Sequence, residues 1–186
     1  HLDQIPNQSL LGLVYRLAYP HPGNRLLWLA LAGAALVFGM WRAALAGRRG
    51  DEVAGLALAG MTGALVSPVS WQHHLYWFIP ALVVLVDVAA SPDVTHRRWY
   101  AGLAALVWFT VTFSVIAWFD WKILPSSLIH SPVGLVAGDW HLLLMVLLLG
   151  VLPIRAGVDT SPQPAPAAPA TAAANRVAAR STQPGR

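Results

Sequence analysis

The stretch Leu26–Ala46, with the sequence LLWLALAGAALVFGMWRAALA, decides the fold class of this chain. It contains no ionisable side chain before Arg42, which lies near its end. At a rise of about 1.5 Å per residue, a helix of this length crosses a hydrocarbon core of about 30 Å. We therefore expect Leu26–Ala46 to form a membrane-spanning helix.

The rest of the chain is similarly apolar, because 56% of its residues are hydrophobic, only 11% are charged and the mean hydropathy is +0.56. This composition excludes an ordinary soluble domain, which needs more charged surface. The absence of cysteine excludes disulfides, thiolate metal sites and cysteine nucleophiles. The net charge of +4 comes from arginines in short loops and in the tail, with no basic helix, so we expect no nucleic-acid partner.

Further apolar runs predict an all-α fold, a polytopic transmembrane bundle of about five helices. The bundle should occupy residues 26–157, preceded by an extracytoplasmic loop over 1–25 that contains a short interfacial helix. Residues 158–186 are rich in Pro and Ala and should form a disordered cytoplasmic tail. The chain opens on His1 without a Met or a signal peptide, so we expect it to be the C-terminal part of a longer protein. The expected spans cover about 26–46, 53–66, 75–90, 99–119 and 133–154.

The arginines predict the orientation, because short cytoplasmic loops are enriched in Lys and Arg. Most of them follow the first, third and fifth spans, as do Arg48, Arg97 and Arg155, and this side should be cytoplasmic. The loops on the opposite side, 1–25, 67–74 and 120–141, then face outward at the plasma membrane. Every unusual polar cluster of the chain lies in this outer set.

The sharpest of these clusters is Ser67-Pro68-Val69-Ser70-Trp71-Gln72-His73-His74. Two histidines and two serines around a proline place many hydrogen-bonding groups at the membrane surface, which a lipid-facing turn does not require. A polar helix cap with Trp71 as an interfacial anchor is the alternative. We expect no bound metal and no cofactor, since adjacent histidines point in different directions and no recognised ligand spacing follows them.

Two further clusters share the outer side. Asn7-Gln8-Ser9 precedes a short apolar run, and helix capping would account for one of its three polar side chains. Lys122, Asp139 and His141 are weaker candidates: a cation there could neutralise a phosphate and Asp139 could bind sugar hydroxyls. Ordinary solvated loop charges are the alternative for each of them.

Together, Asn7-Gln8-Ser9-Leu10 and the motif ending in His73-His74 resemble the polyprenol-phosphate-mannose-dependent α-1,2-mannosyltransferases, glycosyltransferase family 87. The resemblance covers roughly residues 3 to 80, and the double-histidine motif is its most specific part. It implies the C-terminal part of a GT-C membrane fold. It also implies inverting transfer of mannose from a polyprenyl-phosphate donor to a glycolipid acceptor on the outer face, where a carboxylate takes the acceptor's proton.

By this resemblance, His73 and His74 bind the donor phosphate or sugar, while Ser67, Ser70, Trp71 and the Asn7-Gln8-Ser9 motif shape the same pocket. The general-base aspartate of such enzymes lies in the first outer loop, which we expect upstream of this chain. The chain alone should therefore be inactive.

Two other functions remain open. A lipid-donor pentosyltransferase would carry the same motif. A transporter or structural membrane subunit would instead need polar groups near mid-membrane or an internal repeat, and the sequence shows neither clearly.

Overall fold

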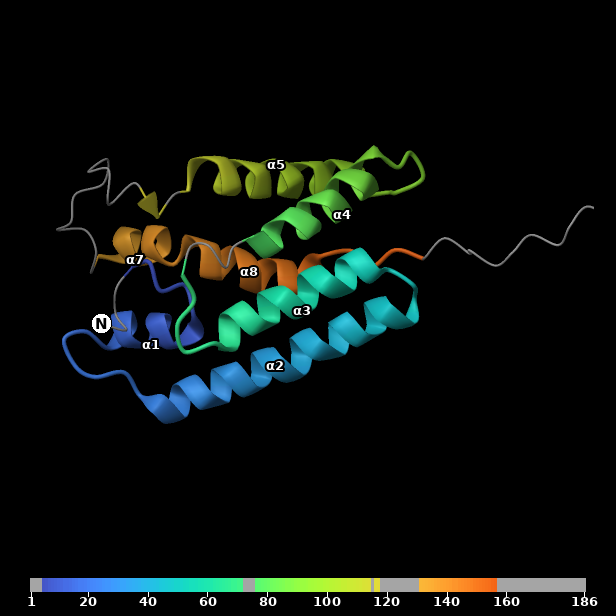
Figure 1. Ribbon diagram of the computed structural model, residues 1–186. Coiled ribbons are helices and arrows are strands. Elements are labelled where there is room, and N and C mark those ends of the chain that lie inside the picture. Colours follow the sequence, from blue (N-terminus) through green and yellow to red (C-terminus); the bar gives the residue numbers. More distant parts are fainter. Residues whose placement is uncertain (1–4, 72–75, 115, 118–130, 157–186) are drawn as a thin grey trace, which may run out of the picture.

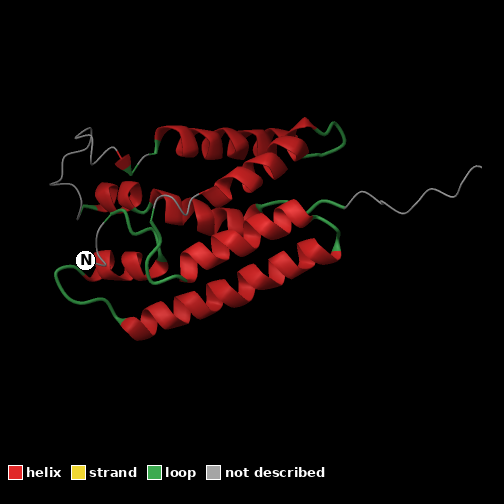
Figure 2. Cartoon of the chain, in the orientation of Figure 1, coloured by secondary structure: helices red, strands yellow, loops and turns green. Residues whose placement is uncertain are grey.

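The computed structural model describes residues 5–71, 76–114, 116–117 and 131–156. Within these ranges the chain consists of helices joined by loops and has no strand, which confirms the all-α prediction. Figure 2 shows the helices and the loops between them. The predicted tail over 158–186 lies outside the described residues. The helices are α1 (Leu10–Ala18), α2 (Arg25–Arg48), α3 (Glu52–Val66), α4 (Phe78–Ala90), α5 (Arg97–Phe113), α7 (Pro132–Gly138) and α8 (Trp140–Val151).

The helices form an elongated bundle built around two antiparallel pairs (Figure 1). One pair is α2 and α3, the other is α4 and α5, and α8 runs between the two pairs. The short helices α1 and α7 lie at the end that holds the N-terminus, while the α2–α3 and α4–α5 turns lie at the opposite end. The core contains side chains of α3, α4 and α8, among them Leu58, Leu85 and Leu148.

Side-chain oxygens cap several helix starts. Asn24 Oδ1 accepts hydrogen bonds from the amides of Leu26 and Leu27, which satisfies donors that the first turn of α2 leaves free. Asp51 plays the same part for α3 by accepting from the amide of Ala54. Between these two helices Gly50 has a φ of 74°, a conformation that glycine adopts without strain.

Small residues allow α2 and α3 to pack closely. A Cβ added at Gly39 would overlap the side chain of Thr62, and one added at Gly55 would lie 3.5 Å from the carbonyl oxygen of Ala43. Gly60 lies against the ring of Trp77, and a Cβ added at Gly63 would meet nothing within 4 Å. Of the three glycines of α3, Gly55 therefore serves the approach of α2, whereas Gly60 makes room for the ring of Trp77.

Each predicted span overlaps a helix, but among the described helices only α2 is by itself long and apolar enough to cross a membrane. The helices α7 and α8 pass the same test as a pair, although they are bent by 66° at Asp139. The apolar helices α3 and α4 have 15 and 13 residues and are shorter than a full span. The part of the chain that the structure describes thus holds one span candidate, or two with the bent pair, and five spans remain a prediction.

An arginine joins three segments at the end that carries the α2–α3 and α4–α5 turns. Arg155, just after α8, binds Asp51 at 2.6 Å and Asp87 of α4 at 2.9 Å. Arg42 of α2 donates to the carbonyl oxygens of Leu149 and Leu152 at 2.5 and 2.6 Å and so caps the end of α8. This end of the bundle is therefore held by charge-assisted hydrogen bonds.

The pKa of the Asp51 carboxylate is lowered in the folded protein. Burial raises its pKa, but the hydrogen bonds and charge of Arg155, with the amide of Ala54, outweigh burial, and the net pKa is lowered. The hydrogen bonds and the charge of Asp51 in turn raise the pKa of Arg155. A lowered folded-state pKa gives a stabilisation that is present above the pKa of an unfolded Asp, about 3.9, and is lost as the pH falls through the folded value.

We predict that Asp51→Asn lowers the midpoint of thermal unfolding in detergent, at a cost of about 1–3 kcal/mol near pH 7, because Asn keeps the cap of α3 but loses the charge. The difference from the unmodified chain should be smaller at an acid pH well below about 3.9 than at pH 7, because the stabilisation is lost as the carboxylate of Asp51 becomes protonated. Glu52→Gln, at the exposed neighbouring position, is the control and should change little. A difference that stays constant between the two pH values would contradict this account.

Candidate functional site

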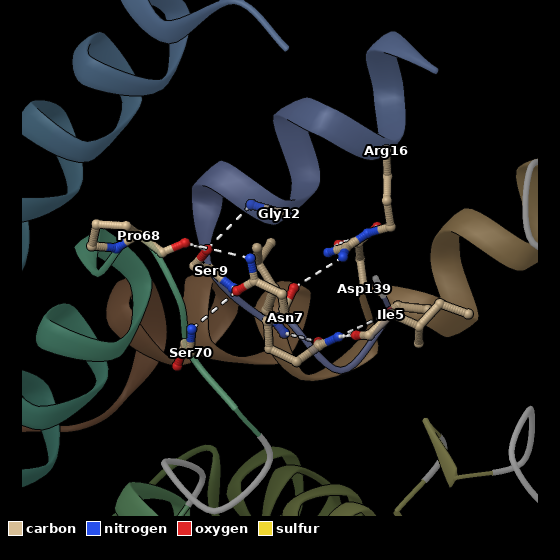
Figure 3. A network of polar contacts seen from close by, with 11 residues as sticks. Ile5, Asn7, Ser9, Gly12, Arg16, Pro68, Ser70 and Asp139 are labelled. Carbon is tan, nitrogen blue, oxygen red and sulfur yellow. Dashed lines mark hydrogen bonds and ion pairs between the residues drawn. The ribbon is translucent and has the colours of Figure 1, made fainter. Parts of the chain in front are cut away.

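The Asn7-Gln8-Ser9 segment lies buried at the end of the bundle, immediately before α1. The exposed fractions of the three residues are 3%, 0% and 0%. Because buried polar groups need hydrogen-bond partners, their contacts define what the segment does. Figure 3 shows these contacts, which run to the turn after α3 on one side and to the α7–α8 junction on the other.

Asn7 and Ser9 hold the turn that follows α3. Asn7 Oδ1 accepts from the amide of Ser70 at 3.0 Å, and Ser9 Oγ donates to the carbonyl oxygen of Pro68 at 3.1 Å. The amide of Gln8 donates to the carbonyl oxygen of Ser70 at 2.7 Å. Ser9 Oγ also accepts from the amide of Gly12 and thereby caps α1. The first two polar motifs of the sequence are therefore joined, mainly through backbone groups of the turn.

The Gln8 side chain is inserted between α7 and α8. Its Nε2 donates to the carbonyl oxygen of Gly138 at 2.5 Å, and its Oε1 accepts from the amide of Leu142 at 3.2 Å. In an unbroken helix the amide of Leu142 would bond that same carbonyl of Gly138, four residues earlier. The side-chain amide of Gln8 thus replaces one backbone hydrogen bond of the helix. Insertion of a side chain in this way is a recognised cause of a sharp helix bend.

A buried ion pair lies beside this insertion. Arg16 of α1 pairs with Asp139 at the α7–α8 junction, with its Nε 3.1 Å from both carboxylate oxygens and its Nη2 on Oδ1. Its Nη1 donates to the carbonyl oxygen of Asn7 at 2.9 Å. Both side chains are 2% exposed. A planar guanidinium suits such a buried, multiply bonded position.

Sequence analysis assigned no role to Arg16 and missed this ion pair. The available signal was an isolated arginine between Val14-Tyr15 and Leu17-Ala18, because a charged side chain on an apolar helix needs a partner when it is buried. The partner is 123 residues away, so the pair itself could not be read from spacing.

The predicted site residues fall into three groups. His73, His74 and Lys122 lie outside the described residues. Asn7, Gln8, Ser9 and Asp139 are bonded to backbone or to Arg16, as described above. The third group holds three residues at the turn and His141 of α8. Ser67 Oγ donates to the carbonyl oxygen of Val69 at 2.8 Å, Ser70 and His141 are buried, and Trp71 is 44% exposed.

Two buried polar atoms flank the Gln8 insertion without a hydrogen-bond partner in the described part of the chain. They are Ser70 Oγ and His141 Nδ1. The ring of His141 packs near that of Phe78, with centroids 6.1 Å apart. Buried polar atoms without partners are costly, so these two are available to a ligand or to water. No group of three or more potential metal ligands occurs among the described residues.

The geometry is that of a rigid polar platform at one end of the bundle. Trp140 adds to it, since its Nε1 donates to Thr110 Oγ1 of α5 at 3.0 Å. The platform presents the turn that leads toward His73 and His74, and it carries two unused hydrogen-bonding groups. None of its described side chains is a free carboxylate suited to proton transfer.

Comparisons with known proteins identify relatives of one kind. A polyprenol-phosphate-mannose-dependent alpha-(1-2)-phosphatidylinositol mannoside mannosyltransferase of Mycolicibacterium smegmatis is 35% identical over 121 residues, which is 57% of this chain and 26% of the relative. The chain's homologues are polyprenol-phosphate-mannose-dependent mannosyltransferases. The protein of that name from Mycobacterium tuberculosis H37Rv is 30% identical over 152 residues, covering 63% of this chain and 36% of the relative.

A phosphatidylinositol pentamannoside mannosyltransferase of Mycobacterium tuberculosis CDC 1551 is 26% identical over 144 residues, covering 60% of this chain and 33% of the relative. The chain thus spans between a quarter and about a third of the length of these relatives. No family model and no solved structure matches the chain.

We predict that Gln8→Leu lowers the thermal stability of the chain in detergent by several times more than Asn24→Ala. Leucine has a similar volume but leaves the carbonyls of Ile5 and Gly138 without their donor, each at a cost of about 1–3 kcal/mol. Loss of the exposed α2 cap at Asn24 should cost about 1 kcal/mol. Equal losses in the two variants would show that Gln8 is not a buried bridge.

Proposed function

We propose that the chain is part of a membrane mannosyltransferase of the GT-C type, similar to glycosyltransferase family 87. It transfers mannose, with inversion, from a polyprenyl-phosphate donor to a glycolipid acceptor of the phosphatidylinositol mannoside class. The observation that carries this proposal is the 35% identity over 121 residues to an enzyme whose name states donor and acceptor. The 24-residue apolar helix α2 supports a place in the membrane.

In this proposal the donor site lies at the end of the bundle that carries α1 and α7, on the extracytoplasmic side of the plasma membrane. His73 and His74 bind the donor phosphate, with Trp71 and Ser67 in the same turn. The proposed part of Asn7, Gln8 and Ser9 is to position this turn, because their side chains are already bonded within the protein. A site held this rigidly loses little entropy when the donor binds.

The remaining candidates take different parts. Ser70 Oγ and His141 Nδ1 have no partner within the described residues and are offered to the donor's sugar or phosphate. Asp139 is engaged by Arg16 and acts as a positioning residue. Lys122 is proposed as a cation for the leaving phosphate, from its sequence position alone.

The proposed mannosyl transfer has three chemical requirements. An acceptor hydroxyl attacks the anomeric carbon, a carboxylate takes the hydroxyl proton, and hydrogen-bond donors or cations stabilise the phosphate that leaves. The histidine turn would supply the last of these. The base is assigned to no residue of this chain, and the proposal includes neither a metal nor a nucleotide sugar.

One observation bears on the alternative of a transporter, because broken helices often line transport paths. Here the break between α7 and α8 is filled by Gln8 and by the Arg16–Asp139 pair, which are all buried. The break therefore supports a polar platform better than a path for solutes. A lipid-donor pentosyltransferase would use the same platform, and only the donor distinguishes the two.

The test is transfer of labelled mannose from polyprenyl-phosphate mannose to phosphatidylinositol mannosides in membranes containing the complete protein. We predict that His74→Ala lowers this transfer by about 100-fold, since a lost stabiliser of transition-state charge has an effect of that order. His21→Ala, at an exposed position between α1 and α2, is the control and should retain transfer.

Unchanged transfer by His74→Ala would remove His74 from the site. Transfer of a pentose in place of mannose would favour the pentosyltransferase alternative. No transfer of either sugar to any acceptor would contradict the proposed function.

A further inference from the structure

The end of the bundle opposite the polar platform is formed by two neighbouring turns. The α2–α3 turn contains Arg48, Arg49 and Asp51, and the α4–α5 turn runs from Ser91 to His96 (Figure 1). Arg155 holds the two turns together, because its guanidinium bonds both Asp51 and Asp87 at the end of α4. The charges of the two turns therefore act on the same region of the surface.

Four arginines on these turns are exposed and form no ion pair within the part of the chain that the structure describes. This follows from the way the acids are used, since Arg155 already engages Asp51 and Asp87. The acids left nearby are Glu52 and Asp93, both exposed. A surplus of positive charge thus remains at this end of the bundle. The four arginines are Arg48, Arg49, Arg97 and Arg98.

The α4–α5 turn lines an open surface cavity of about 770 Å³. Its wall carries Arg97 and Arg98 together with Thr95, Asp93 and Trp99. Both arginines belong to the first turn of α5, which contains no acidic residue and has no side-chain cap. Positive side chains are unfavourable at a helix N-terminus, where the helix dipole is itself positive. An anion in the cavity would offset both the charge of the two arginines and the positive end of the helix dipole.

Exposed tryptophans suggest where this end of the bundle lies. Trp99 at the start of α5 is 56% exposed, and Trp41, two turns before the end of α2, is 59% exposed. Large exposed indoles are unfavourable in water but favourable at the boundary between lipid and water. The arginines of the two turns would then lie at the level of the phospholipid headgroups.

We propose that the cavity of the α4–α5 turn, flanked by the arginines of the α2–α3 turn, binds the phosphodiester headgroup of an anionic phospholipid. The inference rests on the proposed function only for the placement of the chain in a membrane. Arg97 and Arg98 contact the phosphodiester, Thr95 offers a hydroxyl to it, and Arg48 and Arg49 add a longer-range attraction. The ligand is a component of the bilayer, distinct from the donor and the acceptor of the transfer reaction.

The opposite end does not offer the same chemistry among its described residues. Arg16 is buried and bonded to Asp139, so its charge is already neutralised. Arg25, at the start of α2, is exposed and is not accompanied by a neighbouring arginine. This asymmetry provides the control for a binding experiment.

The experiment measures retention of phosphatidylglycerol by the purified 186-residue chain in a neutral detergent, by native mass spectrometry with phosphatidylcholine as the reference lipid. We predict preferential retention of phosphatidylglycerol, and a loss of about fivefold in its apparent affinity for each of the two cavity arginines, Arg97 and Arg98, that is removed. The double variant Arg97→Gln/Arg98→Gln should show the largest loss, Arg48→Gln/Arg49→Gln a smaller one, and Arg25→Gln none. Circular dichroism verifies that the variants retain their helices.

A further variant tests the charge of the cavity. Asp93→Asn removes the one carboxylate in its wall and should raise the affinity for phosphatidylglycerol, because a like charge is removed. A decrease would overturn the proposal, since removal of a charge that repels the phosphodiester should not weaken its binding. Equal retention of phosphatidylcholine and phosphatidylglycerol would also overturn it.

Two more outcomes separate the possible sources of binding. Competition by millimolar inorganic phosphate as effective as that by the lipid would identify a free-phosphate site and contradict the proposal. Unchanged phosphatidylglycerol retention in Arg97→Gln/Arg98→Gln would contradict it as well. The measurement requires no sugar transfer, so failure of the mannosyltransferase assay leaves this result unaffected, and the reverse also holds.

Discussion

One end of this bundle depends on the side-chain amide of Gln8, which donates to the carbonyl oxygen of Gly138 and accepts from the backbone amide of Leu142. It satisfies the two backbone groups that the α7–α8 break would leave without partners in an apolar surrounding, where each is costly. Asp139 lies at this break, where it pairs with Arg16 of α1. One inserted side chain therefore determines the bend, the burial of an ion pair and the position of α1.

The same segment fixes the turn after α3, since Asn7, Ser9 and the backbone of Gln8 all bond to it. A hydrogen-bonded scaffold of this kind suits a binding site that must keep its geometry at a membrane surface. The other end of the bundle is held differently, by the ion pairs of Arg155, and leaves its outer arginines unpaired among the described residues. We therefore propose different ligands for the two ends, a sugar-phosphate and a phospholipid headgroup.

The helices could be predicted because their signal is local. Leu26–Ala46 is apolar apart from Arg42 and lies within α2, and the span predicted over 133–154 begins one residue after Pro132, the first residue of α7. The polar segment Asn7-Gln8-Ser9 also stood out, but its role could not be predicted. Its long-range partners lie 59 to 134 residues away and are largely backbone groups, which have no sequence pattern. Arg16 was missed for the same reason.

The angle between α7 and α8 tests this account most directly. Residual dipolar couplings of backbone amides, measured on the purified chain in detergent micelles, give the relative orientation of the two helices. The account predicts two helical segments that meet at Asp139 with a bend of about 66°. Couplings that fit a single straight helix from Pro132 to Val151 would contradict it, because the amide of Leu142 would then bond Gly138 directly and leave no place for Gln8.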